Sequence, residues 1–357
     1  MSTFQQYSPG DIVQDDALIH SNTWSTGNNA LTTFHTSSTE ALNYATPSSS
    51  GQFFLDMYHA KPSITSSVEF SIAYGHKAGS GSRDFSTGTG GTGFGATKTI
   101  YNQYRQLVYG DENQEFTFQG ITPDDIYVIN FERARIKQGL KKGSLNLQLT
   151  SGSTVRGRIH LTDDSTSNSG SGVNTALGKQ FNLVTGSNGT MLGTLATQTV
   201  SGSYGFVYPE SGIIILNPKA LKCKIGNLHI PDGATAQASE FDITPSASSN
   251  SDGLNVRKLY NAMKGGASFV IDSEETVSST YFFTRVTNGE FNYSTNTSFQ
   301  NNTGDVRFSS MVSNPRVYIT TVGLYNDNHE LLAVAKLSKP LAKDFTKEAL
   351  IRIKLDY

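Results

Sequence analysis

The alternation of residue types near the C-terminus constrains the fold of this chain more than any other feature. Residues 317–322 read VYITTV, in which β-branched residues dominate and alternate with period two. Such residues suit a half-buried pleated strand. The Asn-Asp-Asn of residues 326–328 tolerates the left-handed backbone of a tight turn, and residues 331–337 resume an apolar run of strand length. The pattern predicts a β-hairpin.

A further strand is predicted at the C-terminal end, after a connection that contains Pro340 and residues 342–348. Apolar residues alternate there with charged ones, at Ile351, Ile353, Leu355 and Tyr357. Successive side chains of a strand point to opposite faces, so these four residues are expected to face a core. Because chain ends fray unless they are held, we expect Tyr357 to be anchored in the sheet.

Charge and hydropathy disfavour several classes of function. The chain has 357 residues, with 28 Lys and Arg against 30 Asp and Glu. The formal charge of -2 provides no basic field, so specific nucleic acid is not an expected partner. No stretch approaches the ~20 apolar residues that span a bilayer, so no membrane partner is expected. The N-terminus lacks the pattern of a secretory signal, which predicts a cytosolic origin.

The remaining composition is typical of an extended β protein. The one cysteine, Cys223, excludes an internal disulfide framework and is predicted to be a small buried apolar residue. Charged residues make up 16% of the chain, below the roughly 25% of soluble domains, whereas Gly, Ser, Thr and Asn are abundant. A polar but weakly charged surface of this kind suits burial against partner subunits.

Four regions are predicted along the chain. Residues 1–50 are expected to form an N-terminal arm or a loosely structured strand region, with Trp24 packed on its own domain rather than on a partner. Residues 51–150 are predicted to form a β domain with one amphipathic helix, and residues 151–250 a Ser/Thr/Gly-rich β insertion. Residues 251–357 are predicted to form a C-terminal β-hairpin module that could complete the 51–150 domain.

The fold class predicted is mainly β, with antiparallel β-sandwich-like domains, one or two short helices and long Gly/Ser/Thr-rich loops. Residues 52–74 predict a two-stranded meander, and residues 125–136 a strand buried on both faces that forms a hairpin-like pair with residues 145–149. A second, short helix is predicted at residues 254–264. The first covers residues 96–110, ends at Gly110, and has on one face Ile100, Tyr104, Leu107 and Val108.

The sequence provides no motif that predicts a cofactor or metal. Residues 88–93 match G-x-G-x-x-G, but no strand precedes them, so a flexible loop is the expected structure. The seven histidines never form a zinc-hydrolase motif. His160 with Asp163 and Asp164 could form part of a cation site, although a carboxylate pair in a polar loop is more often a solvated turn.

Two further functions leave candidate residues. A glycosidase needs two carboxylates, for which Asp124, Asp125 and Glu132 are candidates, although ion pairs of Glu132 with Arg133 or Arg135 are the more ordinary expectation. A receptor- or glycan-binding module would use exposed aromatic residues. Its candidates, which equally fit a strand core, are Tyr204, Phe206 and Tyr208.

Residues 318–357, YITTVGLYNDNHELLAVAKLSKPLAKDFTKEALIRIKLDY, and residues 124–149, DDIYVINFERARIKQGLKKGSLNLQL, carry a family resemblance. They resemble structural proteins of T-even-like contractile-tailed bacteriophages, particularly those of marine cyanobacteria. The resemblance implies a hairpin corner at residues 323–326 and a return strand at residues 332–338. It also implies an assembly role, with no catalytic residues to carry over.

The expected function is therefore that of a non-enzymatic virion structural protein in the tail, baseplate or neck. It would be made in the host cytoplasm, need no cofactor, and bind other virion proteins and copies of itself through interfaces. The alternatives are a capsid-surface decoration protein, a fibre module that binds a host-surface glycan, and a particle-associated hydrolase.

Leu355→Asp tests the predicted inward face of the last strand. The substitution should lower the free energy of unfolding by several kcal/mol, because it places an unpaired charge in a sheet core. Urea denaturation followed by circular dichroism measures the change. A variant as stable as the original chain would show that the inward face is assigned incorrectly.

Overall fold

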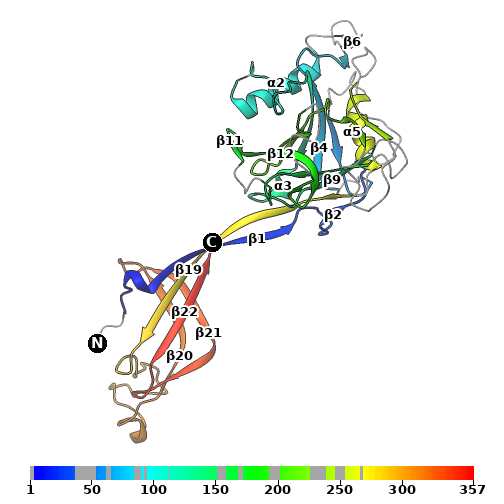
Figure 1. Ribbon diagram of the computed structural model, residues 1–357. Helices are drawn as coiled ribbons and strands as arrows, with labels where there is room; N and C mark the ends of the chain where they lie inside the picture. Colours follow the sequence, from blue (N-terminus) through cyan, green and yellow to red (C-terminus); the bar gives the residue numbers. More distant parts are fainter. Residues whose placement is uncertain are drawn as a thin grey trace. The chain divides into compact units, whose positions relative to one another are not determined.

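A computed structural model shows that antiparallel strands dominate the chain, which confirms the mainly β prediction (Figure 1). The structure describes residues 4–36, 54–61, 66–83, 90–91, 95–111, 113–150, 158–167, 172–192, 202–225, 239–245, 254–265 and 268–357. The predicted glycine-rich loop at residues 88–93 lies mostly outside them.

The described chain divides into two compact units. Unit 1 comprises residues 1–18 and 276–357, and unit 2 comprises residues 19–275. The chain passes between them within β1 (Ile12–Asn22) and β19 (Asp272–Val286). This grouping differs from the four predicted regions, because strand pairing between distant residues decides it rather than local composition.

A curled antiparallel sheet forms the framework of unit 2 (Figure 1). Strands from residues 151–250 lie inside this sheet, so that region is not a separate insertion. β11 (Val173–Thr175) and β13 (Thr190–Met191) extend β12. The order across the sheet is β2 (Ala30–Leu31), β18 (Phe269–Val270), β9 (Asn146–Thr150), β10 (Arg158–Asp163), β12 (Gly178–Ser187), β14 (Gly205–Tyr208), β15 (Ile213–Leu216), β7 (Asp125–Phe131), β4 (Phe70–His76) and β3 (Phe54–Met57).

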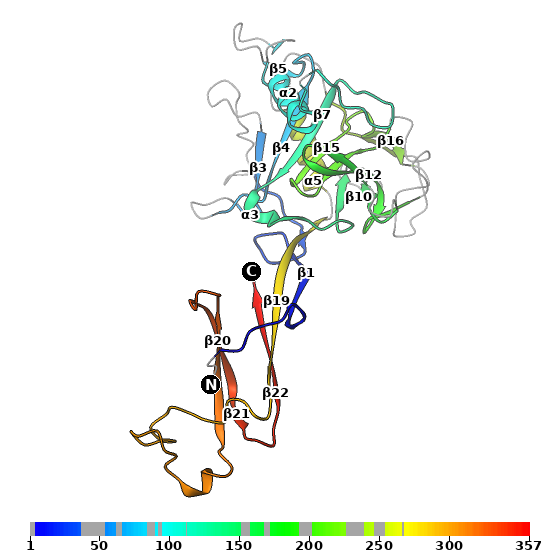
Figure 2. The same ribbon diagram turned by 90° about the vertical axis from the view of Figure 1, so that its left-hand side faces the viewer.

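Both faces of the central strands are buried, as the apolar sequence of β7 predicts (Figure 2). Tyr127 and Ile129 face a core that includes helix α5 (Leu254–Lys264). Ile126 and Val128 face a second core that includes helix α2 (Ala96–Tyr109). Unit 2 therefore has three layers, with the sheet between the two helices.

Helix α2 confirms the predicted cap and corrects one residue of the predicted face. Gly110 has a φ of 71°, and its amide donates to the carbonyl of Gln106. Tyr101 and Val108 are buried, but Leu107 is 42% exposed. Helix α5 has the bounds predicted for it. The short helix α3 (Arg133–Ile136) ends the predicted strand early, at Phe131.

Aromatic rings from distant segments meet in the core beside α5. The Trp24 ring lies 5.1 Å from that of Phe269 and 5.8 Å from that of Phe131, centre to centre. Trp24 therefore packs on its own unit, as predicted. Of the two predictions for the N-terminal region, the strand region agrees with the structure and the arm does not, since β1 and β2 are strands and Leu31 and Phe34 are buried.

Strand pairing confirms the meander but corrects the second hairpin. β3 pairs with β4, with Leu55 opposite Ile72. β7 pairs with β4 and β15, whereas β9 pairs with β10 and β18. β7 and β9 do not form a hairpin because α3 and β8 (Gly139–Leu140), which pairs with β19, separate them.

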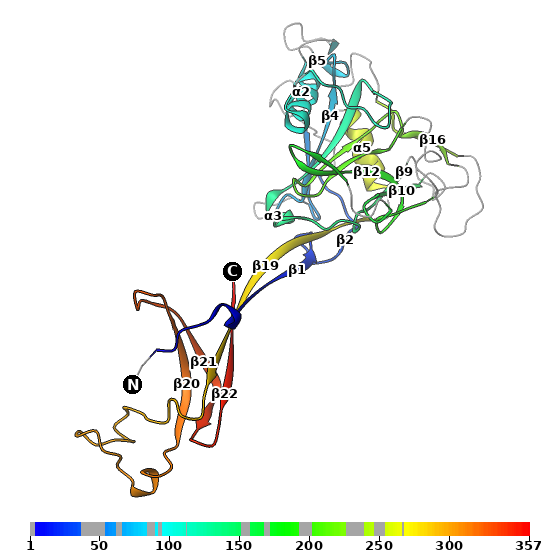
Figure 3. The same ribbon diagram turned by 60° about the vertical axis from the view of Figure 1, so that its left-hand side comes forward.

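Unit 1 has a sandwich-like arrangement of two layers (Figure 3). β1, β19 and β22 (Ala349–Asp356) form one layer, and the hairpin of β20 (Val317–Tyr325) and β21 (Leu331–Lys343) forms the other. The hairpin is confirmed, but its corner is not at residues 323–326, because β20 continues to Tyr325 and the turn follows it. β21 also continues through the predicted connection at Pro340. Leu324, Ile351 and Ile353 are buried where the layers meet.

The last strand has the predicted inward face for three of its four residues. Leu355 packs partly buried against the core of unit 1, beside Ile351 and Ile353, so the cost of Leu355→Asp should lie at the lower end of its range. The Tyr357 amide donates to the carbonyl of Ser278 at 3.0 Å, but its side chain is 73% exposed. The backbone of Tyr357 is anchored, and its side chain does not belong to the core.

Short elements complete the described structure. They are the 3₁₀ turns η1 (Pro9–Asp11) and η3 (Ser309–Met311), and the two-stranded ribbons of β5 (Ser82–Arg83) with β6 (Gly90–Gly91) and of β16 (Lys222–Ile225) with β17 (Ser239–Asp242). Cys223 lies in β16.

Gly75→Ala should lower the free energy of unfolding by about 1–3 kcal/mol, because helix α2 crosses β4 at Gly75. A Cβ there would lie 2.9 Å from the backbone nitrogen of Tyr101 and 3.1 Å from its Cα, and helix backbone cannot rotate aside. Urea denaturation measures the effect. The matched control is Gly289→Ala, where a Cβ meets nothing within 4 Å. Equal stability of the two variants would contradict close contact between α2 and β4.

Candidate functional site

The residues considered for a cation site are arranged to fix strands. Asp163 and Asp164 are buried rather than solvated. Asp163 accepts hydrogen bonds from the Gly143 amide at 2.9 Å and from the Ser165 hydroxyl. Asp164 accepts from the amide and side chain of Asn182, both at 2.9 Å. The two carboxylates therefore tie β10 to the turn before β9 and to β12.

His160 does not complete a site with these aspartates. His160 and Asp163 are three residues apart in one strand, so their side chains leave opposite faces of the sheet. Across the described parts of the chain, no group of three or more His, Cys, Asp or Glu is placed to hold a metal ion.

The candidate carboxylates of a glycosidase are not brought together. Asp125 begins β7 and Glu132 follows its last residue, which separates them by ~23 Å along an extended strand. The paired carboxylates of glycosidases lie about 5–9.5 Å apart. Asp124 instead pairs with Lys77 at 2.6 Å. Glu132 forms no ion pair with Arg133 or Arg135. The Arg133 guanidinium instead donates to the carbonyl of Lys137.

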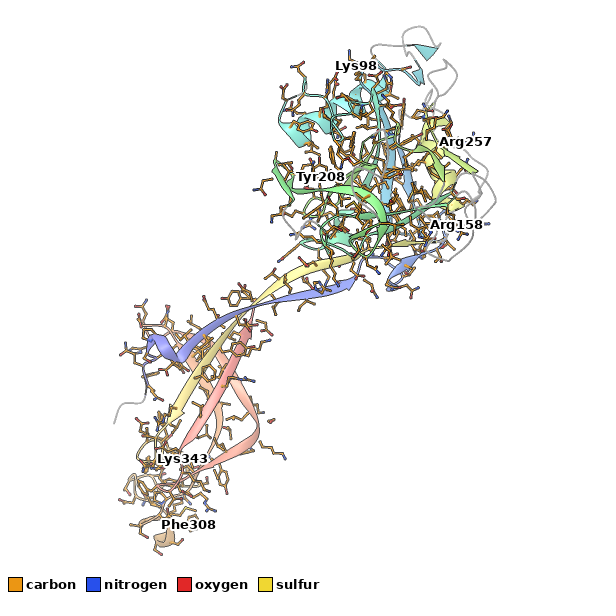
Figure 4. All side chains as sticks on the ribbon, viewed as in Figure 1. Lys98, Arg158, Tyr208, Arg257, Phe308 and Lys343 are labelled. Carbon is orange, nitrogen blue, oxygen red and sulfur yellow. The ribbon has the colours of Figure 1, made fainter. Side chains whose placement is uncertain are left out.

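The candidate aromatic residues of a glycan site are buried, so they belong to a strand core and not to an exposed binding site. The exposed fractions of Tyr204, Phe206 and Tyr208 are 0%, 4% and 0%. The Phe206 ring stacks on that of Phe118 at 4.4 Å, and the Tyr208 hydroxyl (labelled in Figure 4) donates to Gln180 at 2.8 Å. These aromatic residues stabilise the sheet and cannot reach a ligand at the surface.

The structure joins a serine, a histidine and a glutamate that the sequence did not connect. Glu69 is fully buried and accepts a hydrogen bond from the Ser25 amide at 3.0 Å. The His59 Nδ1 lies 3.1 Å from Glu69 and 3.0 Å from the Ser25 hydroxyl. A catalytic histidine contacts its serine and its carboxylate through different ring nitrogens. Here one nitrogen meets both, so the cluster joins three chain segments and does not form a nucleophilic triad.

The feature that most distinguishes the molecule is the exposed apolar surface of unit 1. Few of its large apolar side chains are buried, namely Val286, Phe299, Val317, Leu324, Ile351 and Ile353. Many more are exposed, namely Phe4, Ile12, Val13, Leu18, Phe291, Tyr293, Phe308, Val312, Tyr318, Tyr325, Leu331, Leu332, Val334, Phe345, Leu350 and Tyr357. Contiguous exposed apolar surface is typical of interaction sites.

Part of this surface is one contiguous patch near the hairpin turn. We define the hairpin patch as Tyr325, Leu331, Leu332 and Val334, whose exposed fractions run from 46% to 68%. A Cβ at Gly323 would lie 2.9 Å from the Tyr325 ring and 3.2 Å from the Leu331 side chain, so both side chains lie over this glycine. A register shift between Leu324 and Tyr325 leaves Leu331 and Leu332 both on the exposed side.

Aromatic contacts hold one end of the hairpin in place, and hydrogen bonds hold the other. At one end the Phe4 ring stacks on His329 at 4.9 Å and meets the edge of Tyr325 at 5.1 Å. At the other the buried ammonium of Lys343 (labelled in Figure 4) donates to Asn292 Oδ1 at 2.8 Å and to the carbonyls of Asn288 and Asp344 at 3.0 Å. The hairpin therefore presents its patch on a fixed framework.

Ion pairs surround this framework. Asp344 lies 3.5 Å from Lys347 and 3.7 Å from Arg316. Hydrogen bonds from Thr346 lower the pKa of Asp344, and the Lys347 charge lowers it further. Because the carboxyl stays ionised, these pairs persist at neutral pH.

Comparisons with protein-family models, curated proteins and solved structures give no match to this chain. Where the structure describes the chain, no helix combines the length and the hydropathy needed to cross a membrane.

Asp125→Asn should stabilise the protein at neutral pH. Burial raises the pKa of Asp125 to about 6, an effect that the Tyr74 hydroxyl at 3.3 Å only partly offsets. In the unfolded chain the pKa of this carboxyl is near its ordinary value of 3.8. Between these two values the folded state binds more protons, so stability falls as pH rises through this window. At pH 8 the free energy of unfolding of the variant should exceed that of the original chain by about 1–2 kcal/mol. This is less than the full pKa shift implies, because water still reaches the carboxyl.

Urea denaturation at pH 4 and pH 8 measures this difference, which should be confined to the higher pH. Asp124→Asn is the matched control. The hydrogen bond from Lys77 lowers the pKa of Asp124, so this variant should be slightly less stable at pH 8. Identical pH profiles for Asp125→Asn and the original chain would contradict the burial of an ionised Asp125.

Proposed function

We propose that this protein is a structural component of the virion of a contractile-tailed bacteriophage, in the tail, baseplate or neck, and that it acts through interfaces on unit 1. The observation that carries the proposal is the excess of exposed over buried large apolar side chains in unit 1. The resemblance of residues 124–149 and 318–357 to phage structural proteins points to the same role.

Water contacts the exposed apolar side chains of unit 1 unless another protein covers them. Each fully buried large apolar side chain stabilises an assembly by about 1.5–3 kcal/mol. Phe308 and Val312 flank the short turn η3 and are 54% and 68% exposed. Leu350 lies on β22 and is 66% exposed. Phe308 is labelled in Figure 4. Partner subunits would gain this free energy by covering them.

Among the alternatives, a glycan-binding fibre module loses its support, because its candidate aromatics are buried. A capsid-surface decoration protein would use the same kind of interface. We propose the tail, baseplate or neck because the resemblance concerns structural proteins of contractile-tailed phages.

Replacing Phe308, Val312 and Leu350 together by Ser tests the role of unit 1 in assembly. The triple variant should fold with nearly unchanged stability, since exposed substitutions usually change it by less than about 0.5 kcal/mol each. In a phage that carries it in place of the original gene, incorporation into particles should fall to background, measured by mass spectrometry of purified virions. The control is Val173→Ser, an equally exposed position in unit 2. Normal incorporation of the folded triple variant would overturn the proposal.

A further inference from the structure

The first part of β21, residues 332–335, places small residues inside and larger ones outside. Ala333 and Ala335 face the core of unit 1 and are partly buried, and further along the strand Leu337 and Leu341 also pack against this core. The outward residues are the larger Leu332 and Val334, which are 68% and 59% exposed. A sheet with one solvated face normally places large apolar residues inside and polar residues outside. The outward face of β21 is therefore built to be covered.

Charged residues at the two ends of the patch indicate what covers it. Glu330 precedes Ala333 by three residues, and Lys336 follows it by three. Asp327 and Lys339 repeat this arrangement six residues to either side. All four are exposed. A two-fold axis near Ala333 would therefore bring Glu330 of one chain to Lys336 of the other, whereas Asp327 lies in the turn outside β21.

The local contacts leave these charges available. Glu330 is oriented by Asn326, whose side-chain amide donates to one carboxylate oxygen at 2.7 Å. Within the described parts of the chain, Lys336 and Lys339 have no ion-pair partner. The lysines thus lack the partner that a second copy would supply.

We propose that two copies of this chain associate through the outward faces of their β20–β21 hairpins. The β21 strands run antiparallel about a two-fold axis near Ala333. Leu332 and Val334 of each copy pack on those of the other, and Glu330 of each copy pairs with Lys336 of its partner. The interface is isologous, so every contact occurs twice. The inference rests on the proposed role of unit 1 as an interaction surface.

The exposed face of β22 does not have this self-complementarity. Arg352 and Lys354 occupy its centre and lie over the Tyr281 ring at 5.4 Å and 6.0 Å. A two-fold axis at Ile353 would place Arg352 of one copy beside Lys354 of the other, and like charges in contact repel. β20 carries no charged residue from Val317 to Tyr325 and so nothing that would set a register.

A charge exchange in the full chain tests the contact and its symmetry. Sedimentation velocity should show a concentration-dependent dimer for the original chain. Glu330→Lys alone and Lys336→Glu alone should each weaken the dimer by roughly tenfold at low salt, because both symmetry-related pairs become repulsive. An equimolar mixture of the two variants should recover the dimer, since each new lysine then meets a new glutamate.

The double variant E330K/K336E should also recover the dimer, and Val173→Lys, at an exposed position of unit 2, should not weaken it. Circular dichroism verifies that each variant is folded. A monomeric original chain, or a mixture that associates no better than its components, would overturn the two-fold contact. If the chain is monomeric but still enters particles, this inference fails and the proposed function stands. If the triple variant of unit 1 also enters particles, both fail.

Discussion

The burial of both faces of β7 and β15 is the interaction on which the structure of unit 2 depends. Alternate side chains of each strand enter separate cores, with Ile129 and Ile214 on the side of α5 and Val128 and Ile215 on the side of α2. A strand buried on both faces cannot shift by one residue without exchanging its two sets of side chains, but here both sets are apolar. The register is therefore held by neighbours such as Gly75, where only a glycine allows α2 to approach, and by buried carboxylates at the strand ends.

Unit 1 is also built from antiparallel strands, but more of its large apolar side chains are exposed than buried. Its two layers bury a thin core, and Leu332 and Val334 on the outward side of β21 are larger than their inward neighbours Ala333 and Ala335. Such a surface is costly in water and becomes favourable only when another protein covers it. Unit 2 contains most of the buried side chains, whereas unit 1 carries the surface that supports the proposed role in assembly.

The sequence predicts elements whose signals are local. Alternation identified β7, β20, β21 and β22, and the helical period with Gly110 identified α2. β1 was missed because its side chains are nearly all exposed and carry no alternation. The burial of Asp163 depends on Gly143, twenty residues away, and the contact of Ser25 with Glu69 spans forty-four residues. No local pattern encodes such pairings, which is why the predicted regions also differed from the two units. The hairpin itself was predicted, but the exposure of Leu332 and Val334 required knowledge of which face was covered.

The division of unit 1 between the two ends of the sequence affects the order of events during synthesis. Unit 2 is continuous from residue 19 to residue 275, so the ribosome completes it before β20, β21 and β22 emerge. Domains generally fold as units during translation. The hairpin of β20 and β21 emerges only after the larger unit has been synthesised. β22, which supplies Ile351 and Ile353 to the core beneath the hairpin, emerges later still. Most of the contacts that bury apolar side chains can therefore form before the exposed apolar side chains of the hairpin leave the ribosome.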